Sequence, residues 1–205
     1  MKNTALVIGF CLATFWGTAQ SVSDNVSRWS YGFNLGVNYS NVLVDRQLLS
    51  KDVVSNGVGL RLGLLADYKL SETVSISPKA ELSFNRGTLD VPENDGSFSL
   101  YEVMPISMDF MTHFVFKRDG SACNPYLLIG PKFSVPISDV NDNTTSFETG
   151  YNLAVDVGIG FEKAFSFFRI SPELRYSFGL LNVNQNPIFQ DVKFHNLALV
   201  FNFMD

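Results

Sequence analysis

Residues 29–40, WSYGFNLGVNYS, alternate without interruption between two kinds of side chain. Every second residue is large and apolar, whereas the residues between them are only serine, glycine and asparagine. Successive side chains of a β-strand point to opposite faces, so this pattern predicts a strand with one wholly apolar face. The stretch is long enough to cross a membrane, which takes roughly 9–11 tilted residues, and aromatic residues lie near both ends of its apolar face.

The same alternation recurs along the chain and predicts eight strands, at residues 29–40, 57–68, 74–84, 104–116, 126–135, 151–162, 168–179 and 196–203. Pro78 would ordinarily mark a sheet edge or a bulge, but the alternation continues through it. Short connections at 69–72, 117–124 and 163–166 alternate with long ones at 42–56, 86–99, 138–149 and 181–191.

An even number of strands with short turns at one end and long loops at the other is typical of bacterial outer-membrane barrels. We therefore predict an all-β fold, an eight-stranded antiparallel transmembrane up-and-down β-barrel. In the bacterial outer membrane the short turns face the periplasm, so both termini are expected to be periplasmic. A soluble barrel is disfavoured because the charged residues of the strands lie on the face opposite the aromatic ones.

The first residues have the layout of a secretory signal peptide: Lys2, an apolar run from Ala5 to Trp16, and a small-residue site at 17–19. We expect a signal peptide at residues 1–19 and an outer-membrane barrel domain at residues 20–205. The mature chain would keep only Cys123, which cannot form an internal disulfide.

Composition agrees with a wall that faces lipid. Charged residues make up 17% of the chain, compared with about 25% in soluble domains. The formal net charge of −5 argues against nucleic acid as a partner.

Both signs of charge occur on the face opposite the apolar residues. An eight-stranded barrel is just wide enough to be filled by its own side chains, and enclosed charges must be paired. We predict an interlocked interior network rather than an open pore, with neighbours such as Arg61–Glu81, Asp156–Arg175 and Glu162–Arg169, and with His113 beside Asp67 or Glu162. The predicted network consists of Arg61, Asp67, Lys79, Glu81, Asp109, His113, Lys132, Asp156, Glu162, Arg169, Glu173 and Arg175.

Aromatic residues of the apolar face are expected to lie where lipid meets water. These lipid-interface residues are Trp29, Tyr31, Tyr39, Tyr68, Tyr151, Phe161, Phe168, Tyr176, Phe201 and Phe203.

Catalytic chemistry finds little support in this chain. The two histidines, His113 and His195, are expected at opposite rims, with no serine or cysteine placed to form a nucleophile pair. Two distant histidines also do not make a metal site. We predict no catalytic, metal-binding or cofactor-binding residues, and a protein that is not an enzyme.

Several segments resemble one known family. They are FNLGVNYS at 33–40, LLADYKLSE at 64–72, ISPKAELSF at 76–84, NPYLLIGPKFS at 124–134, DVGIGFE at 156–162 and ISPELRYSFGL at 170–180. Together they resemble the PorT-type outer-membrane β-barrel family of bacteria that use type IX secretion.

The resemblance implies an accessory part in type IX protein export. The implied partners are outer-membrane lipid and other proteins of the secretion machinery. A second hypothesis is a structural or adhesion barrel whose long loops bind an external ligand. A third, a barrel enzyme acting on lipid or peptide, is the least favoured.

Overall fold

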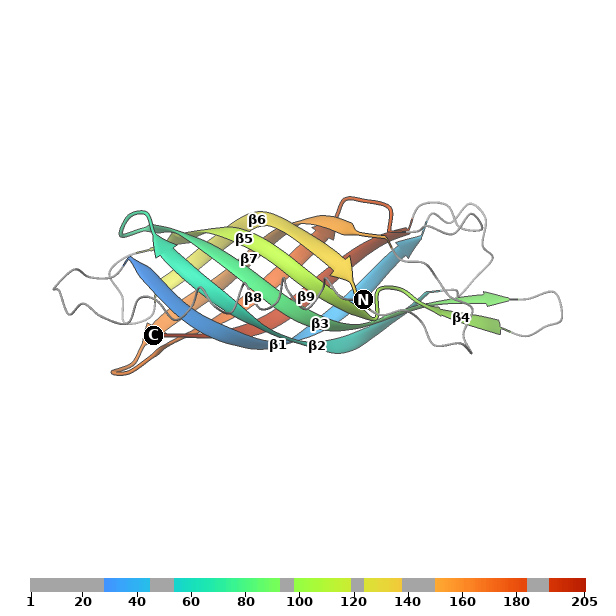
Figure 1. The fold of residues 1–205 in the computed structure, drawn as a ribbon, viewed down its shortest axis with the longest axis horizontal. Coiled ribbons are helices and arrows are strands. Elements are labelled where there is room, and N and C mark those ends of the chain that lie inside the picture. The colour runs from blue at the N-terminus through green and yellow to red at the C-terminus, as the bar shows by residue number, and fades with distance from the viewer. Residues whose placement is uncertain (1–27, 45–53, 93–97, 119–123, 138–149, 184–191) are drawn as a thin grey trace, which may run out of the picture.

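The computed structural model describes residues 28–44, 54–92, 98–118, 124–137, 150–183 and 192–205 (Figure 1). These residues form nine β-strands and no helix. In chain order the strands are β1 (Trp29–Val44), β2 (Val54–Lys69), β3 (Val74–Pro92), β4 (Phe98–Glu102), β5 (Ile106–Lys117), β6 (Asn124–Pro136), β7 (Asn152–Ala164), β8 (Arg169–Gly179) and β9 (Val192–Met204). The described residues therefore contain no helix that is long and apolar enough to span a membrane.

Eight of the strands close into an antiparallel barrel. Each strand pairs with the next around the wall, β3 pairing with β5, and β9 returns to pair with β1 over Gly32↔Met204 to Val44↔Val192. Because β1 also pairs with β2, no strand of the barrel is left as an edge. The predicted fold class, an eight-stranded antiparallel β-barrel, is confirmed.

The ninth strand, β4, lies outside the closed wall. It pairs only with the far end of β3, from Thr88↔Glu102 to Pro92↔Phe98. Figure 1 shows this β3–β4 hairpin projecting beyond one end of the barrel, which we call the hairpin end. The opposite end, where the chain terminates and where β2 turns into β3, we call the turn end.

Alternation decides which side chains fill the barrel. In β6 every second residue from Tyr126 to Ser134 is buried, and the residues between them are exposed. The polar set of β1 behaves in the same way, since Asn34 and Asn38 are buried while Phe33 and Leu35 are exposed. The inward face is thus largely polar and the outward face apolar, as the sequence predicted.

The prediction of a loop at residues 86–99 was wrong. Residues up to Pro92 continue β3, and β4 begins at Phe98, so this segment is mostly paired backbone. Glycine, proline and aspartate in the segment made it resemble a loop, but cross-strand hydrogen bonds satisfy its backbone all the same. The strands also extend further than predicted at the hairpin end, where β1 reaches Val44 and β2 starts at Val54.

The alternation of the predicted strand at 104–116 puts Met104 on the same outward face as Phe110 and Phe114, and this prediction was also wrong. It lies in the bend between β4 and β5, has a positive φ of 50° and is fully buried. The side chain of Asn85 donates a hydrogen bond to the Met104 carbonyl over 3.0 Å. The bend turns Met104 into the mouth of the barrel, where it contributes to the apolar cap described below.

Pro78 belongs to β3 as predicted, but it interrupts the ladder with β2. The β2–β3 register runs to Leu65↔Lys79 and resumes at Tyr68↔Ile76, so the pairs around Pro78 are missing. Proline has no N–H, and the carbonyl of Ala66 loses its ladder donor. The hydroxyl of Ser77 donates to this carbonyl instead, over 3.1 Å.

Pro131 produces the same interruption between β5 and β6. Their register is broken between Met111↔Lys132 and Phe114↔Ile129. The preceding residue is Gly130, and a Cβ atom at this position would overlap the Thr112 carbonyl. This close approach of two backbones makes glycine necessary.

We expect Gly130→Ala to lower the free energy of unfolding by about 1–3 kcal/mol, because the added methyl group must displace the β5 backbone. Ser134→Ala is the matched control, since it lies on the same buried face of β6. Urea titration of the barrel in lipid vesicles, followed by the gel mobility of folded and unfolded forms, measures both changes. Equal stabilities for the two variants would contradict the proposed clash.

Candidate functional site

The interior of the barrel holds a layered network of ion pairs, centred on Glu81. Arg61 Nη1 lies 3.0 Å from Glu81 Oε2, and Arg175 Nη2 lies 2.7 Å from the same oxygen. The amide of Asn34 donates to Oε1 over 2.9 Å. All three charged side chains have no exposed surface, so the pairing offsets a desolvation penalty of several kcal/mol per ion.

Glu173 forms the next layer toward the turn end. It accepts hydrogen bonds from Lys79 Nζ over 2.9 and 3.1 Å, and Arg175 Nη1 lies 3.3 Å away. The hydroxyl of Tyr126 and the amide of Asn202 donate to it over 3.2 and 3.3 Å. Arg175 therefore links the two carboxylates, because its guanidinium reaches both Glu81 and Glu173.

Asp109 occupies the side of the network nearer the hairpin end. Lys132 Nζ lies 2.9 Å from Asp109 Oδ2, and the Ser83 hydroxyl donates to that oxygen over 2.8 Å. Arg61 Nη2 is 3.8 Å away, which joins Asp109 to the central cluster.

A further group lies at the turn end and is less deeply buried. Lys117 Nζ is 3.0 Å from Glu162 and 3.5 Å from Asp67, and Arg169 Nη1 is 3.5 Å from Glu162. Lys117 was missed in the sequence, because it was assigned to a turn. The inward alternation His113, Val115, Lys117 would have identified it.

The structure contains the three pairs expected from the sequence, at 3.0 Å for Arg61–Glu81, 3.7 Å for Arg175–Asp156 and 3.5 Å for Arg169–Glu162. The expected neighbours of His113 were wrong. His113 Nε2 lies 3.0 Å from Asp156 Oδ2 and both side chains are fully buried. Gly130 is the register partner of Asp156 and lies next to His113. The two side chains meet across it because it has no side chain of its own.

Charges in this network balance. Lys117 brings the cations to six, which equals the number of carboxylates; the cations are Arg61, Lys79, Lys117, Lys132, Arg169 and Arg175, and the carboxylates are Asp67, Glu81, Asp109, Asp156, Glu162 and Glu173. The formal charge of this network is therefore zero when all twelve groups are ionised.

Apolar side chains close the barrel at the hairpin end. They come from β1, from β9, from the bend before β5 and from the segment after β8. These side chains are at most 4% exposed: Val42, Val103, Met104, Val183, Val192 and Phe194. The sequence analysis missed this cap because only Met104 lies in a predicted strand, whereas Val42 and Val183 lie in predicted loops and the other members lie outside the predicted strands.

The space left inside is small. A cavity of about 20 Å³ lies between Asp67, Tyr126 and Glu173, which is room for about one water molecule. In the described part of the chain, the ion pairs fill the middle of the barrel and the cap lies at its hairpin end.

The two histidines lie on opposite faces of the barrel wall. His113 faces inward, whereas His195 lies on the outward face, where its Nδ1 is 3.1 Å from the Tyr176 hydroxyl. No three histidine, cysteine or carboxylate side chains among the described residues are placed to hold a metal ion. Cys123 and residues 1–19 lie outside the described residues.

The aromatic residues predicted at the lipid interface lie on the outward face. Trp29, Tyr31, Tyr39, Tyr151, Phe161, Phe168 and Phe201 are exposed, and Tyr68, Tyr176 and Phe203 are half-buried. At the turn end the rings of Trp29 and Tyr68 lie 4.7 Å apart. Phe161 and Phe168 lie at the same end, on the β7–β8 hairpin. At the hairpin end Tyr151 lies 5.6 Å from Phe133.

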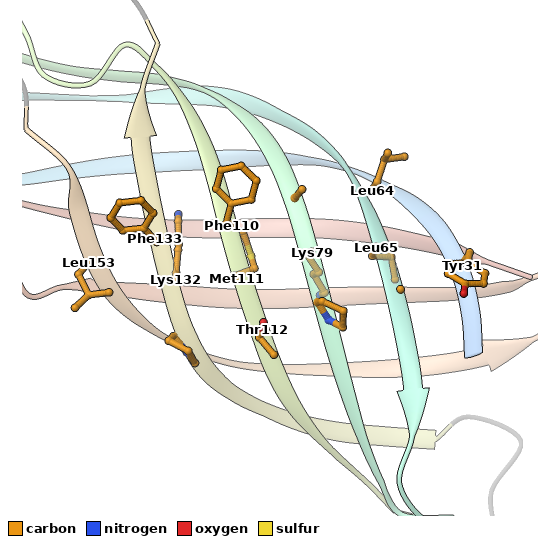
Figure 2. A pocket seen from close by; sticks show the side chains of 14 residues that line it. Tyr31, Leu64, Leu65, Lys79, Phe110, Met111, Thr112, Lys132, Phe133 and Leu153 are labelled. Atoms are coloured by element: carbon orange, nitrogen blue, oxygen red, sulfur yellow. The ribbon is translucent and has the colours of Figure 1, made fainter. Parts of the chain in front are cut away.

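The outward face of the described strands contains a central hollow and a rim hollow. The central hollow, of about 550 Å³, contains short side chains between longer ones: Ala66, Pro78, Ala80, Thr112 and Pro131 are the short ones. Figure 2 shows Leu64, Phe110 and Phe133 standing around it on β2, β5 and β6. The rim hollow, of about 570 Å³, lies nearer the turn end around Pro172.

Comparison with known proteins points to one kind of protein. The model of the family described as outer membrane protein beta-barrel domain matches residues 18–185. No curated protein matches the chain at a significant level.

Solved structures agree on the fold. Neisserial surface protein A is 12% identical, with a TM-score of 0.60 over 87% of this chain and 96% of that one. The outer membrane protein AlkL in lipid bilayers is 16% identical, with a TM-score of 0.56 over 92% of this chain and 95% of that one.

We expect Glu81→Gln to destabilise the barrel by roughly 3–5 kcal/mol, since it leaves Arg61 and Arg175 as buried charges without their shared counter-ion. Glu72→Gln is the matched control, because Glu72 is exposed on the β2–β3 connection. Urea unfolding in vesicles measures both. A loss no larger than that of the control would show that Glu81 is not the centre of the network.

Proposed function

The chain belongs to the outer membrane protein beta-barrel domain family, and on this premise we propose that it is a non-enzymatic, non-conducting barrel that assists protein secretion through its surfaces. The observation that carries this proposal is the filled interior. Ion pairs block the middle of the barrel and the apolar cap closes the hairpin end. A protein of this kind acts by contact at its wall, turns and loops, because its interior cannot pass cargo.

We further propose that the hairpin end faces the outside of the cell. The connections at the turn end are short, from Lys69 to Val74 and from Ala164 to Arg169. Longer ones, from Val44 to Val54, from Pro136 to Asn152 and from Gly179 to Val192, join strands at the hairpin end. Bacterial barrels place short turns in the periplasm, so both termini would be periplasmic and residues 1–19 would direct export.

The secretion system in this proposal is type IX. Its support is the resemblance of segments such as ISPKAELSF at 76–84 and ISPELRYSFGL at 170–180 to the PorT-type family. These segments carry interior charges of the central network, Lys79, Glu81, Glu173 and Arg175, beside outward prolines. The barrel would be an accessory of the translocation machinery, with partners at its periplasmic turns or lipid-facing wall.

A second function is favoured by one feature, the β3–β4 hairpin. Paired backbone carries this hairpin beyond the barrel (Figure 1), so it presents a preorganised surface at the end proposed to be extracellular. An adhesion barrel would bind its external ligand there.

We expect no ion conductance from the purified barrel in planar lipid bilayers, because the network and the cap leave no continuous water path. Single-channel recording at both polarities measures it. The matched variant Glu173→Ala, which opens space beside the small cavity, is expected to remain silent because the cap is intact. Regular conductance steps from the unmodified protein would overturn the closed-barrel proposal.

We expect deletion of the gene to stop release of type IX cargo, and expression of the full chain to restore it. A variant in which an Asn-Gly turn replaces residues 90–100 separates the two functions. Leu89 and Tyr101 are register partners, so a two-residue link can close the shortened hairpin.

Under the secretion proposal, the shortened hairpin restores release in the deletion strain. Two results together would favour the adhesion proposal instead. The deletion strain would release cargo normally, and cells carrying the shortened hairpin would lose attachment.

A further inference from the structure

The rim hollow has a different character from the rest of the lipid-facing wall. Leu127 of β6, Ile159 of β7, and Pro172 and Leu174 of β8 line it, and Arg118 stands at its edge just beyond β5. It is therefore an apolar depression with a cation at the end nearest the turn end of the barrel.

Backbone pairing is interrupted at this hollow. The β7–β8 register stops at Gly160↔Glu173 and resumes at Lys163↔Ile170. Phe161 and Pro172 therefore lie opposite each other without backbone pairing between these two strands. Proline supplies neither an N–H nor a long side chain. The wall therefore lacks a ladder hydrogen bond here, and its outer surface is depressed. At Pro78 the hydroxyl of Ser77 replaces the missing donor, but the corresponding Ser171 hydroxyl is buried without a hydrogen-bond partner.

Among the described residues, Arg118 is the unpaired cation of the rim hollow. Lys117 also lines it, but its ammonium group is directed to Glu162 and Asp67. Arg118 is exposed, and no carboxylate of the described residues pairs with it. The aromatic residues at the same end, Trp29, Tyr68 and Phe161, mark the depth at which lipid headgroups meet the barrel.

We propose that the rim hollow binds one anionic, phosphate-bearing lipid. The guanidinium of Arg118 would take the phosphate, as arginine forms paired hydrogen bonds with phosphate oxygens. One acyl chain would then lie in the hollow against Leu127, Ile159 and Leu174. A lipid fits better than a protein partner for two reasons. The hollow is continuous with the surface that already faces acyl chains, and Arg118, its unpaired charge among the described residues, matches a headgroup phosphate.

The central hollow serves as an internal comparison. It has nearly the same volume, about 550 against about 570 Å³, and it also lies at proline interruptions. Its two lysines, Lys79 and Lys132, are paired inside the barrel with Glu173 and Asp109. An acyl chain in the central hollow therefore meets no free cation, and no headgroup preference is expected there.

Native mass spectrometry of the full barrel, released from nanodiscs of equal phosphatidylglycerol and phosphatidylcholine, tests this proposal. We expect one retained phosphatidylglycerol, favoured over phosphatidylcholine by about fivefold, the contribution of one arginine near a membrane surface. Arg118→Gln should remove the preference. Lys69→Gln, which removes another exposed cation at the turn end, should keep it.

Pro172→Leu provides an independent variant that does not depend on charge. The leucine fills the hollow and restores a backbone N–H opposite Phe161, so the barrel stays folded while retention of both lipids falls. Pro78→Leu in the central hollow should leave the phosphatidylglycerol preference unchanged.

Any of three results would overturn the proposal. Arg118→Gln could keep the phosphatidylglycerol preference of the unmodified protein, or Lys69→Gln could lose it. The third result is a second copy of the chain bound to the unmodified protein and absent from Pro172→Leu. The last result would make the hollow a contact between protomers. The proposal is independent of the role in secretion, because lipid retention is measured on the isolated barrel.

Discussion

Closure of the sheet is the constraint on which the rest of this structure depends. Lipid offers no hydrogen-bond partner to a backbone, so each strand that crosses a membrane must be paired along both sides. The return of β9 to β1 meets this requirement. Closing only eight strands fixes a narrow interior, which side chains must fill. Closure thus dictates an apolar outside, and it brings the inward side chains of all eight strands within reach of one another.

Filling that interior with charges requires long side chains at some inward positions and glycine, which has no side chain, at others. Arg175 crosses the barrel to reach Glu81 on β3 and Glu173 on its own strand. His113 reaches Asp156 only because Gly130 lies between them without a side chain. Gly130 is therefore part of the charge network, since a larger residue there would separate a buried pair as well as displace the β5 backbone.

The strands and the identity of the interior charges could be predicted because a period of two is read directly from sequence. Features that depend on the path of the chain between strands could not. The alternation along the strand places Met104 among the outward residues, but a bend with positive φ turns it inward. The β3–β4 hairpin has the composition of a loop. The neighbours of His113 depend on which strands lie next to each other and on an intervening glycine, information that no single strand contains.

Proline positions connect this sealed interior with the outer wall. Pro78, Pro131 and Pro172 all face outward, and each opens the ladder toward the preceding strand. An unsatisfied backbone group facing lipid costs several kcal/mol, and only the first of these gaps has a hydroxyl donor in place. The gaps coincide with the two hollows of the wall. Because ion pairs and the cap fill the described interior, these depressions, the turns and the projecting hairpin are surfaces at which the barrel can distinguish one binding partner from another.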